Sequence, residues 1–210
     1  MVHRILIYII GLLVLAFGVV FSINSDLGVS PVSSLPLIIS LISGIDMGAS
    51  VTIIFSLFIL MQIVLLRKEF KWINLSQIIF SSIFGYFVDF AKSVLGGFTI
   101  PTYAGQLCMM GIGVALVAFG IAMYVEAGLV NMPMEGLVSA VAHKMPRYAF
   151  HNIKVALDCT VGALSIALPF IFLGELHGVR EGTIISAVFI GKLIPVMKKI
   201  ITPLVCKSDL

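Results

Sequence analysis

The most regular feature of this 210-residue chain is a succession of apolar runs separated by short polar breaks. Six runs of about 18 to 21 residues are long enough to cross a hydrocarbon core of about 30 Å at a helical rise of about 1.5 Å per residue. The pattern therefore predicts an all-α polytopic membrane protein with about six transmembrane helices. The predicted spans are Ile5–Ile23, Ala49–Leu66, Leu75–Leu95, Gln106–Val125, Ile153–Leu173 and Gly182–Ile201.

Two shorter apolar segments, Pro31–Ser43 and Pro133–His143, lie between the predicted spans and are too short to cross. Each begins with proline, which favours the first helical turn because its missing N–H is not needed there. We interpret both as short Pro-led helices. They are either re-entrant, with their N-termini at depth, or interfacial and flat on the membrane surface.

An internal repeat relates the two halves of the chain. A shift of 102 positions aligns Ile10–Leu35 with Ile112–Leu137 and gives eight identities in 26 residues. We predict a single integral membrane domain, 1–210, with repeat 1 at about residues 4–95 and repeat 2 at about 106–201. The identical pairs are Ile10/Ile112, Gly11/Gly113, Ala16/Ala118, Phe17/Phe119, Gly18/Gly120, Leu27/Leu129, Pro31/Pro133 and Leu35/Leu137.

The basic residues set the orientation, because short cytoplasmic loops are enriched in Lys and Arg. With the N-terminus in the cytoplasm, Arg4, the loop Arg67–Lys71, Lys144 and Arg147 fall inside, and only Arg180 falls in an outer loop. Each half then makes three crossings. Since three is odd, the second half is inverted relative to the first. We expect a 3+3 inverted repeat with both termini cytoplasmic.

Composition agrees with a bilayer environment. The chain is 60% hydrophobic and 11% charged, and its mean hydropathy is +1.17. A soluble domain carries about 25% charged residues, so this chain could not cover a soluble surface. The net charge of +3 comes from basic residues in short loops, which gives no signal for nucleic acid.

The sequence has no motif for catalysis. It contains no phosphate loop, nucleophile elbow, paired metal-ligand motif or dinucleotide fingerprint. We therefore expect no enzyme, no cofactor and no metal site. Glycines 11, 18, 113 and 120 recur at seven-residue spacing, which lets helices pack closely. Such small-residue faces could serve packing within the chain or a homodimer equally well.

Several short motifs lie along the chain. They are Ser25–Pro31, Phe84–Phe90, Pro133–Gly136, the spaced set Phe150, Lys154 and Asp158, and Glu181–Thr183. With these motifs the chain resembles the YczE/YitT-type bacterial membrane proteins, and most closely their small six-span members. The resemblance covers nearly the whole chain and implies a location in the bacterial plasma (inner) membrane, while it implies no substrate. Met134 departs from the family pattern, in which Gly is expected at this position.

Ionisable groups inside the predicted spans are costly in a bilayer, so each one is a hypothesis for function. Lys154 and Asp158 lie one turn apart in the fifth span. They either form an internal ion pair near the cytoplasmic interface, or Asp158 is the titrating carboxylate of a substrate or proton site. Asp89 and Lys92 form a similar pair in the third span. Lys192, in the sixth, has no acidic neighbour within a turn and needs a partner on another helix or a wet cavity.

The N-termini of the two Pro-led helices form a second candidate site. Free N–H groups and the helix dipole favour anions there. Ser30 precedes Pro31, and Glu135 follows Pro133 within the first turn. If the two helix starts meet near the midplane, they would suit an anionic or zwitterionic solute. Glu135 alternatively fits the general preference for a carboxylate in a first turn.

The repeat and the intramembrane charges together predict a small secondary transporter that moves a small polar or anionic solute by alternating access. A channel-like facilitator and a non-transport membrane scaffold or regulatory protein are the alternatives. The residues predicted to line the solute or ion path are Asp158, Lys154, Lys192, Asp89, Asp26, Ser30, Pro31, Pro133 and Glu135.

Overall fold

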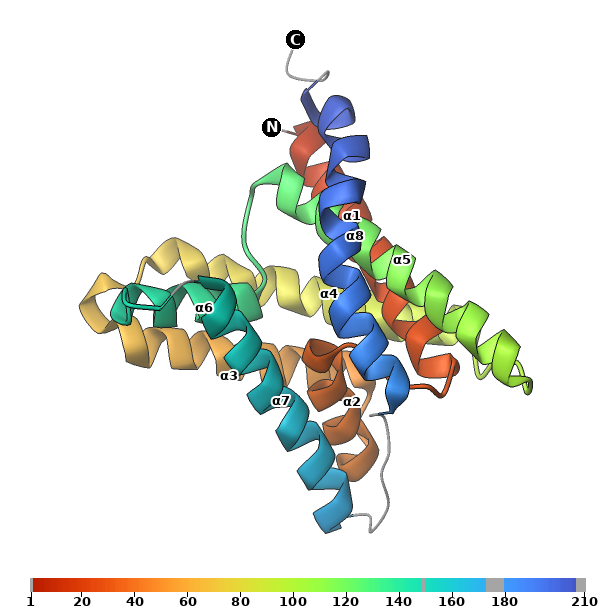
Figure 1. The fold of residues 1–210 in the computed structure, drawn as a ribbon. Helices are drawn as coiled ribbons and strands as arrows, with labels where there is room; N and C mark the ends of the chain where they lie inside the picture. The colour runs from red at the N-terminus through yellow and green to blue at the C-terminus, as the bar shows by residue number, and fades with distance from the viewer. Residues whose placement is uncertain (1, 149, 173–179, 207–210) are drawn as a thin grey trace. The chain divides into compact units, whose positions relative to one another are not determined.

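The computed structural model describes residues 2–148, 150–172 and 180–206 (Figure 1). All regular secondary structure in these residues is helical, which confirms the predicted all-α fold. The elements are α1 (Val2–Asn24), α2 (Pro31–Ser43), α3 (Met47–Leu66), η1 (Arg67–Glu69), η2 (Trp72–Leu75), α4 (Ser76–Leu95), α5 (Tyr103–Ala127), α6 (Pro133–Lys144), α7 (Phe150–Phe172) and α8 (Glu181–Cys206).

The helix boundaries follow the apolar runs closely. The short helix α2 has the predicted bounds, and α6 ends one residue later than predicted. Helix α5 begins at Tyr103, three residues before the predicted Gln106. The reason is a polar cap, since the Thr102 side chain accepts a hydrogen bond of 3.2 Å from the Gly105 N–H. The last residue predicted for the fifth span, Leu173, lies outside the described residues.

Five described helical segments are long and apolar enough to cross a membrane. Helix α8 is also long, at 26 residues, but it carries Lys192, Lys198 and Lys199 and is not among these segments. The five segments are His3–Asn24, Met47–Glu69, Trp72–Leu95, Tyr103–Ala127 and Asn152–Phe172.

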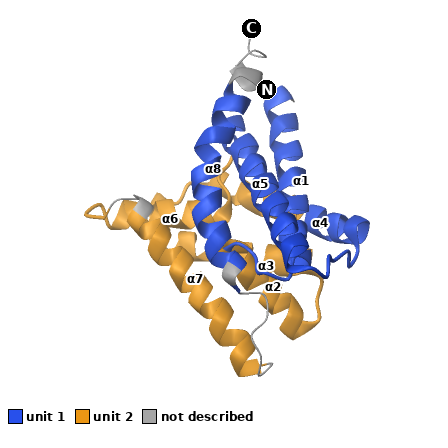
Figure 2. Cartoon of the chain, turned by 45° about the vertical axis from the view of Figure 1, so that its right-hand side comes forward, with its two compact units in different colours: residues 1–30, 86–129, 177–210 blue, residues 31–85, 130–176 orange. Residues whose placement is uncertain are grey.

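The chain divides into two compact units, coloured separately in Figure 2. Unit 1 contains residues 1–30, 86–129 and 177–210, and unit 2 contains 31–85 and 130–176. Each unit takes helices from both halves of the sequence, and α4 contributes to both because the boundary falls at Gly85. The units therefore do not coincide with the two sequence repeats.

In unit 1, α1 and α5 cross in opposite directions at their glycines. Gly11 lies against Gly120, and Gly18 lies against Gly113. A Cβ added at Gly120 would come within 2.7 Å of the Gly11 carbonyl oxygen, so nothing larger than hydrogen fits at this crossing. The predicted packing role of these glycines is confirmed. Helix α8 packs on the same helix α5.

In unit 2, each short helix packs on two long ones. Helix α2 contacts α7 and α3, while α6 contacts α3 and α7. The start of α3 approaches the middle of α4, where a Cβ added at Gly85 would lie 2.8 Å from the Thr52 hydroxyl. Phe55 and Phe84 stack beside this approach with ring centroids 6.1 Å apart. The packing of α6 on α3 and α7 positions the charged residues that α6 and α7 carry.

Candidate solute-binding site

Helices α6 and α7 bring three of the nine predicted site residues together in unit 2. We call Glu135, Lys154 and Asp158 the charged cluster. Lys154 and Asp158 lie one turn apart on α7, and the Lys154 Nζ is 3.4 Å from the Asp158 Oδ2. The internal ion pair predicted from their spacing is confirmed. Their side chains are 34% and 27% exposed, so the pair is half-buried.

Glu135 joins this pair from the neighbouring helix α6. It stands in the first turn of that helix, two residues after Pro133. Lys154 and Asp158 both act electrostatically on its carboxyl group. Its position at a helix N-terminus is favourable for a negative charge, because the backbone dipoles present their positive end there. The sequence placed Glu135 and Asp158 in separate candidate sites, whereas in the structure they lie close enough to interact electrostatically.

Two carboxyl oxygens of the charged cluster lack a hydrogen-bond donor. The Oε2 of Glu135 and the Oδ1 of Asp158 are both buried, and neither has a hydrogen-bond partner in the structure. A buried polar atom without a partner costs about 1–3 kcal/mol, and more when the group is charged. The arrangement can therefore accept hydrogen bonds from a donor that enters the cluster.

The first turn of each Pro-led helix is held by a polar side chain. In α2, the Ser34 hydroxyl donates to the Pro31 carbonyl oxygen at 2.7 Å, and lies 2.8 Å from the Ser165 hydroxyl of α7. In α6, the Gln62 amide of α3 donates to the Pro133 carbonyl oxygen at 3.0 Å. Pro31 and Pro133 thus mark anchored helix starts, and the convergence of the two starts near the midplane stays a prediction.

Gln62 belongs to a buried amide pair that the sequence reasoning missed. Its Nε2 also donates to the Gln77 Oε1 at 3.1 Å, and both side chains are almost fully buried. Gly136 leaves room for the two amides, because a Cβ there would lie 2.7 Å from the Gln62 Oε1. A polar residue inside each apolar run was the available signal, since buried amides need partners on neighbouring helices.

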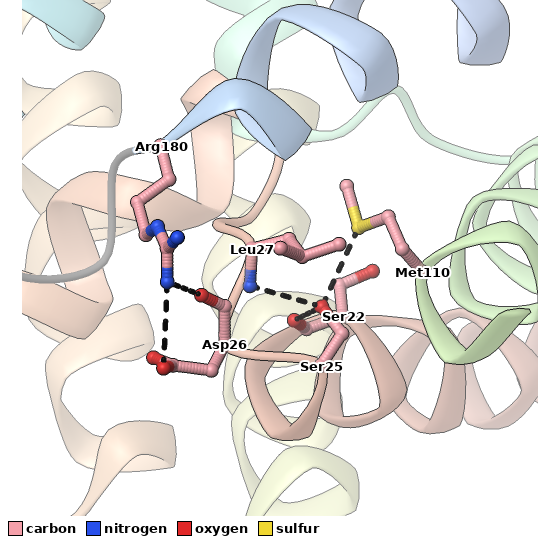
Figure 3. Close-up of polar contacts among 6 residues, drawn as sticks. All are labelled: Ser22, Ser25, Asp26, Leu27, Met110 and Arg180. Carbon is pink, nitrogen blue, oxygen red and sulfur yellow. Dashed lines mark hydrogen bonds and ion pairs between the residues drawn. The ribbon is translucent and has the colours of Figure 1, made fainter. Parts of the chain in front are cut away.

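Asp26 lies in unit 1, where it forms an exposed contact with Arg180 (Figure 3). The Arg180 guanidinium donates to the Asp26 backbone carbonyl oxygen at 2.9 Å and lies 3.6 Å from its carboxylate. Asp26 adopts a φ of +56°, which turns the chain sharply after α1. The next residue, Leu27, accepts a hydrogen bond of 2.8 Å from the Gly182 N–H, so this loop caps the start of α8.

The structure shows how far three other predicted site residues, Ser30, Asp89 and Lys192, are buried. Ser30 is half-buried immediately before α2, and Asp89 is half-buried on α4. Lys192 is exposed on α8, and the described contacts include no ion pair for it. The partner that Lys192 was expected to need is therefore not found within the described part of unit 1.

A separate polar contact lies on the surface of unit 2. The Lys144 Nζ donates to the Glu69 carboxylate at 2.7 Å, and the His143 Nε2 lies 3.1 Å from the same oxygen. The hydrogen bond and the charge of Lys144 lower the pKa of Glu69. All three side chains are well exposed, which makes this group a natural control for the buried carboxyls.

Comparison with known proteins shows which family the chain belongs to. A family model described as a family of unknown function (DUF6198) matches residues 2–199. Among similar proteins is the uncharacterized membrane protein YczE of Bacillus subtilis (strain 168), 26% identical over 188 residues, which are 89% of this chain and 81% of that protein. The uncharacterized protein YyaS of the same strain is 26% identical over 195 residues, or 92% of each chain. No solved structure matches the chain.

Proposed function

The chain belongs to the DUF6198 family, and we propose that it is a small secondary transporter whose charged cluster binds a small polar solute during transport. Its apolar helices and its relatives make it a multi-pass membrane protein. We further propose that a solute crosses the membrane through the protein and that the charged cluster binds it on the way.

One observation carries the proposal, namely the two unpartnered carboxyl oxygens of Glu135 and Asp158. Structural ion pairs in membrane helices satisfy their own polar atoms, because water is scarce there. An arrangement that serves stability alone would lose free energy by leaving these acceptors open. Ionisable residues within membrane helices commonly mark a substrate or proton pathway, and these two stand together with Lys154.

The helix contacts support alternating access as the mechanism. Helices α1 and α5 correspond in the predicted repeat, and their contacts exchange under the shift of 102: Gly11 against Gly120 becomes Gly113 against Gly18. The pairs α2 with α7 and α3 with α6 exchange in the same way. Contacts that map onto each other are expected where two inverted halves rock about a shared site.

In the proposed mechanism, the solute and Lys154 bind Asp158 in turn. In the structure the Lys154 ammonium lies 3.4 Å from the Asp158 carboxylate and neutralises its charge. A solute that donates hydrogen bonds to the free oxygens of Glu135 and Asp158 would satisfy both and compete with Lys154 for Asp158. Release of the solute restores the ion pair, which prevents an isolated buried charge in the empty transporter.

The test is uptake into proteoliposomes from a mixture of small polar metabolites, with internal solutes identified by mass spectrometry. We expect at least one solute to accumulate saturably with the wild-type protein. Asp158→Asn keeps the shape of the side chain but removes its charge, and should abolish this uptake while the protein remains folded. The matched control is Glu69→Gln, which removes an exposed carboxylate of the same unit and should retain uptake.

Either of two results would contradict the proposal. The first is unchanged uptake in Asp158→Asn. The second is an absence of any saturable uptake by the folded wild-type protein over a broad range of solutes and imposed ion gradients. Fast uptake that does not saturate would favour a channel-like facilitator.

A further inference from the structure

The donor and acceptor groups of the charged cluster are unequal in number. Glu135 and Asp158 supply four carboxyl oxygens when ionised, and such groups only accept hydrogen bonds. Lys154 contacts one of these oxygens, the Asp158 Oδ2. The Glu135 Oε2 and the Asp158 Oδ1 are buried without a partner. The groups missing from the cluster are therefore hydrogen-bond donors.

The net charge of the cluster favours a positively charged ligand. When both carboxyl groups are ionised, two carboxylates and one ammonium leave one negative charge. Burying an uncompensated charge costs several kcal/mol, so a bound positive charge would be favoured at this place. An anion would instead be attracted only by Lys154 and repelled by both carboxylates.

The chemistry of the cluster favours an organic cation over a metal ion. Among the described residues there is no group of three or more His, Cys, Asp or Glu side chains that could hold a metal ion. Lys154 stands beside Asp158 and would repel a divalent cation. An ammonium or guanidinium group presents several N–H donors together with a single positive charge, which matches two separate acceptor oxygens.

We propose that Glu135 and Asp158 form the binding site for a small organic cation with N–H donors, a primary ammonium or a guanidinium, with Lys154 as the residue it displaces from Asp158. The inference rests on the proposed function for its biological meaning, since it names the class of solute that is carried. Its physical basis, the two buried acceptor oxygens, is independent of transport.

The first experiment measures binding to the purified wild-type protein in detergent by thermal unfolding. The probes are n-butylammonium and guanidinium, with tetramethylammonium as a cation without N–H donors and butyrate as an anion of similar size. We expect the two donors to raise the unfolding temperature by about 3–6 °C at ten times their Kd. Tetramethylammonium and butyrate should raise it by much less.

The second experiment locates the site with variants of matched shape. In Glu135→Gln and in Asp158→Asn the stabilisation by n-butylammonium should be lost or shifted to at least tenfold higher concentration. In Glu69→Gln the stabilisation should be unchanged, because that exposed carboxylate lies outside the cluster. If a variant does not fold, the comparison of probes on the wild-type protein still decides the ligand class.

The outcomes separate this inference from the proposed transport. Stabilisation by the N–H cations without any uptake would uphold the site and contradict the transporter. Saturable uptake of anions or neutral solutes, with no effect of these cations, would uphold the transporter and overturn the site. Equal stabilisation in wild type and both cluster variants would also overturn the site, as would stabilisation by acid pH alone with no effect of the cations.

Discussion

At the scale of single residues, the polar groups of unit 2 differ in how they are satisfied. The Gln62 amide donates to the Gln77 side chain and to the Pro133 carbonyl oxygen, whereas Glu135 and Asp158 each keep an oxygen without a donor. The first arrangement is typical of a structural contact and the second of a binding site. Substitutions at the two places should therefore affect different measurements, stability in one case and solute binding in the other.

Gly136 should tolerate no side chain, because the amide pair occupies the space. A Cβ there would lie 2.7 Å from the Gln62 Oε1 and 2.9 Å from its Nε2, so the amide would have to leave its partners. We expect Gly136→Ala to destabilise the protein by about 1–2 kcal/mol, measured by thermal unfolding in detergent. The control Gly162→Ala faces open space and should be neutral or stabilising by about 0.5–1 kcal/mol.

A double variant checks that Gln62 is the cause. In a Gln62→Ala background the added methyl group no longer meets the Gln62 amide, and only the Gln77 Nε2 stays close, at 2.9 Å. Gly136→Ala should therefore cost less than it does in the wild-type background. An equal cost in both backgrounds would show that the glycine is needed for another reason.

Glu69 should make stability depend on acid pH with a predictable sign. Lys144 lowers the pKa of Glu69, so the ion pair stabilises the folded state above the ordinary glutamate pKa of about 4.3 and loses this effect as the pH falls through the lowered value. The unfolding temperature of wild type should exceed that of Glu69→Gln slightly at neutral pH. The difference should vanish once the pH falls below the lowered pKa, and it should also shrink in high salt, since the pair is exposed. A difference that grows on acidification would contradict this assignment.

At the scale of elements, the crossing of α1 and α5 is tightly constrained. Its four glycines repeat every seven residues in the sequence, which indicated close packing before any partner helix was known. The partner and the direction are structural findings: Gly11 meets Gly120 and Gly18 meets Gly113. Backbone lies directly opposite backbone there, so no flexible side chain can move aside to relieve a clash.

Gly120→Ala should therefore separate the two helices. Its Cβ would lie 2.7 Å from both the Gly11 carbonyl oxygen and the Leu15 amide nitrogen. We expect a loss of about 1–3 kcal/mol or more in thermal unfolding. Gly111→Ala is the matched control on the same helix, because nothing lies within 4 Å of its added Cβ. Equal stability of the two variants would mean that the crossing is looser than described.

The sequence allowed the elements to be predicted far better than the site. The length of the apolar run and the position of the proline were enough to predict the bounds of α2 and nearly enough to predict those of α6, because both signals are local. The ion pair of Lys154 and Asp158 could also be predicted, because the two residues lie one turn apart on the same helix. Glu135 belongs with this pair only through the packing of α6 on α7, and the amide pair needs three helices. The glutamines inside the apolar runs indicate that each needs a polar partner, but a single sequence does not show which distant segment supplies it.

At the scale of the whole molecule, the orientation of the loops can be measured directly. In a background without Cys108, Cys159 and Cys206, single cysteines replace Asp46 after α2 and Arg147 after α6, both exposed. If neither short helix crosses the membrane, a membrane-impermeant thiol reagent should label Asp46→Cys from outside and Arg147→Cys only after permeabilisation. Thr99→Cys, in the exposed loop between α4 and α5, serves as the outside control.

Labelling of Asp46→Cys and Arg147→Cys from the same side would contradict the inverted repeat. The argument for alternating access would then lose its support from symmetry, although the charged cluster would stay unchanged as a candidate site.

The composition of the two units has a consequence for how the protein is made. Helix α1 is synthesised before α5, the helix that covers its glycine face and lies about a hundred residues later in the chain. At translation rates of about 5–20 residues per second, α1 waits roughly 5–20 s for its partner, and unit 1 waits longer still for α8. During this interval the Gly11 and Gly18 face is open to any other helix in the membrane. Slowing the ribosome between α4 and α5 would lengthen that exposure. We therefore expect the yield of folded protein to depend on the rate of its synthesis as well as on its contacts.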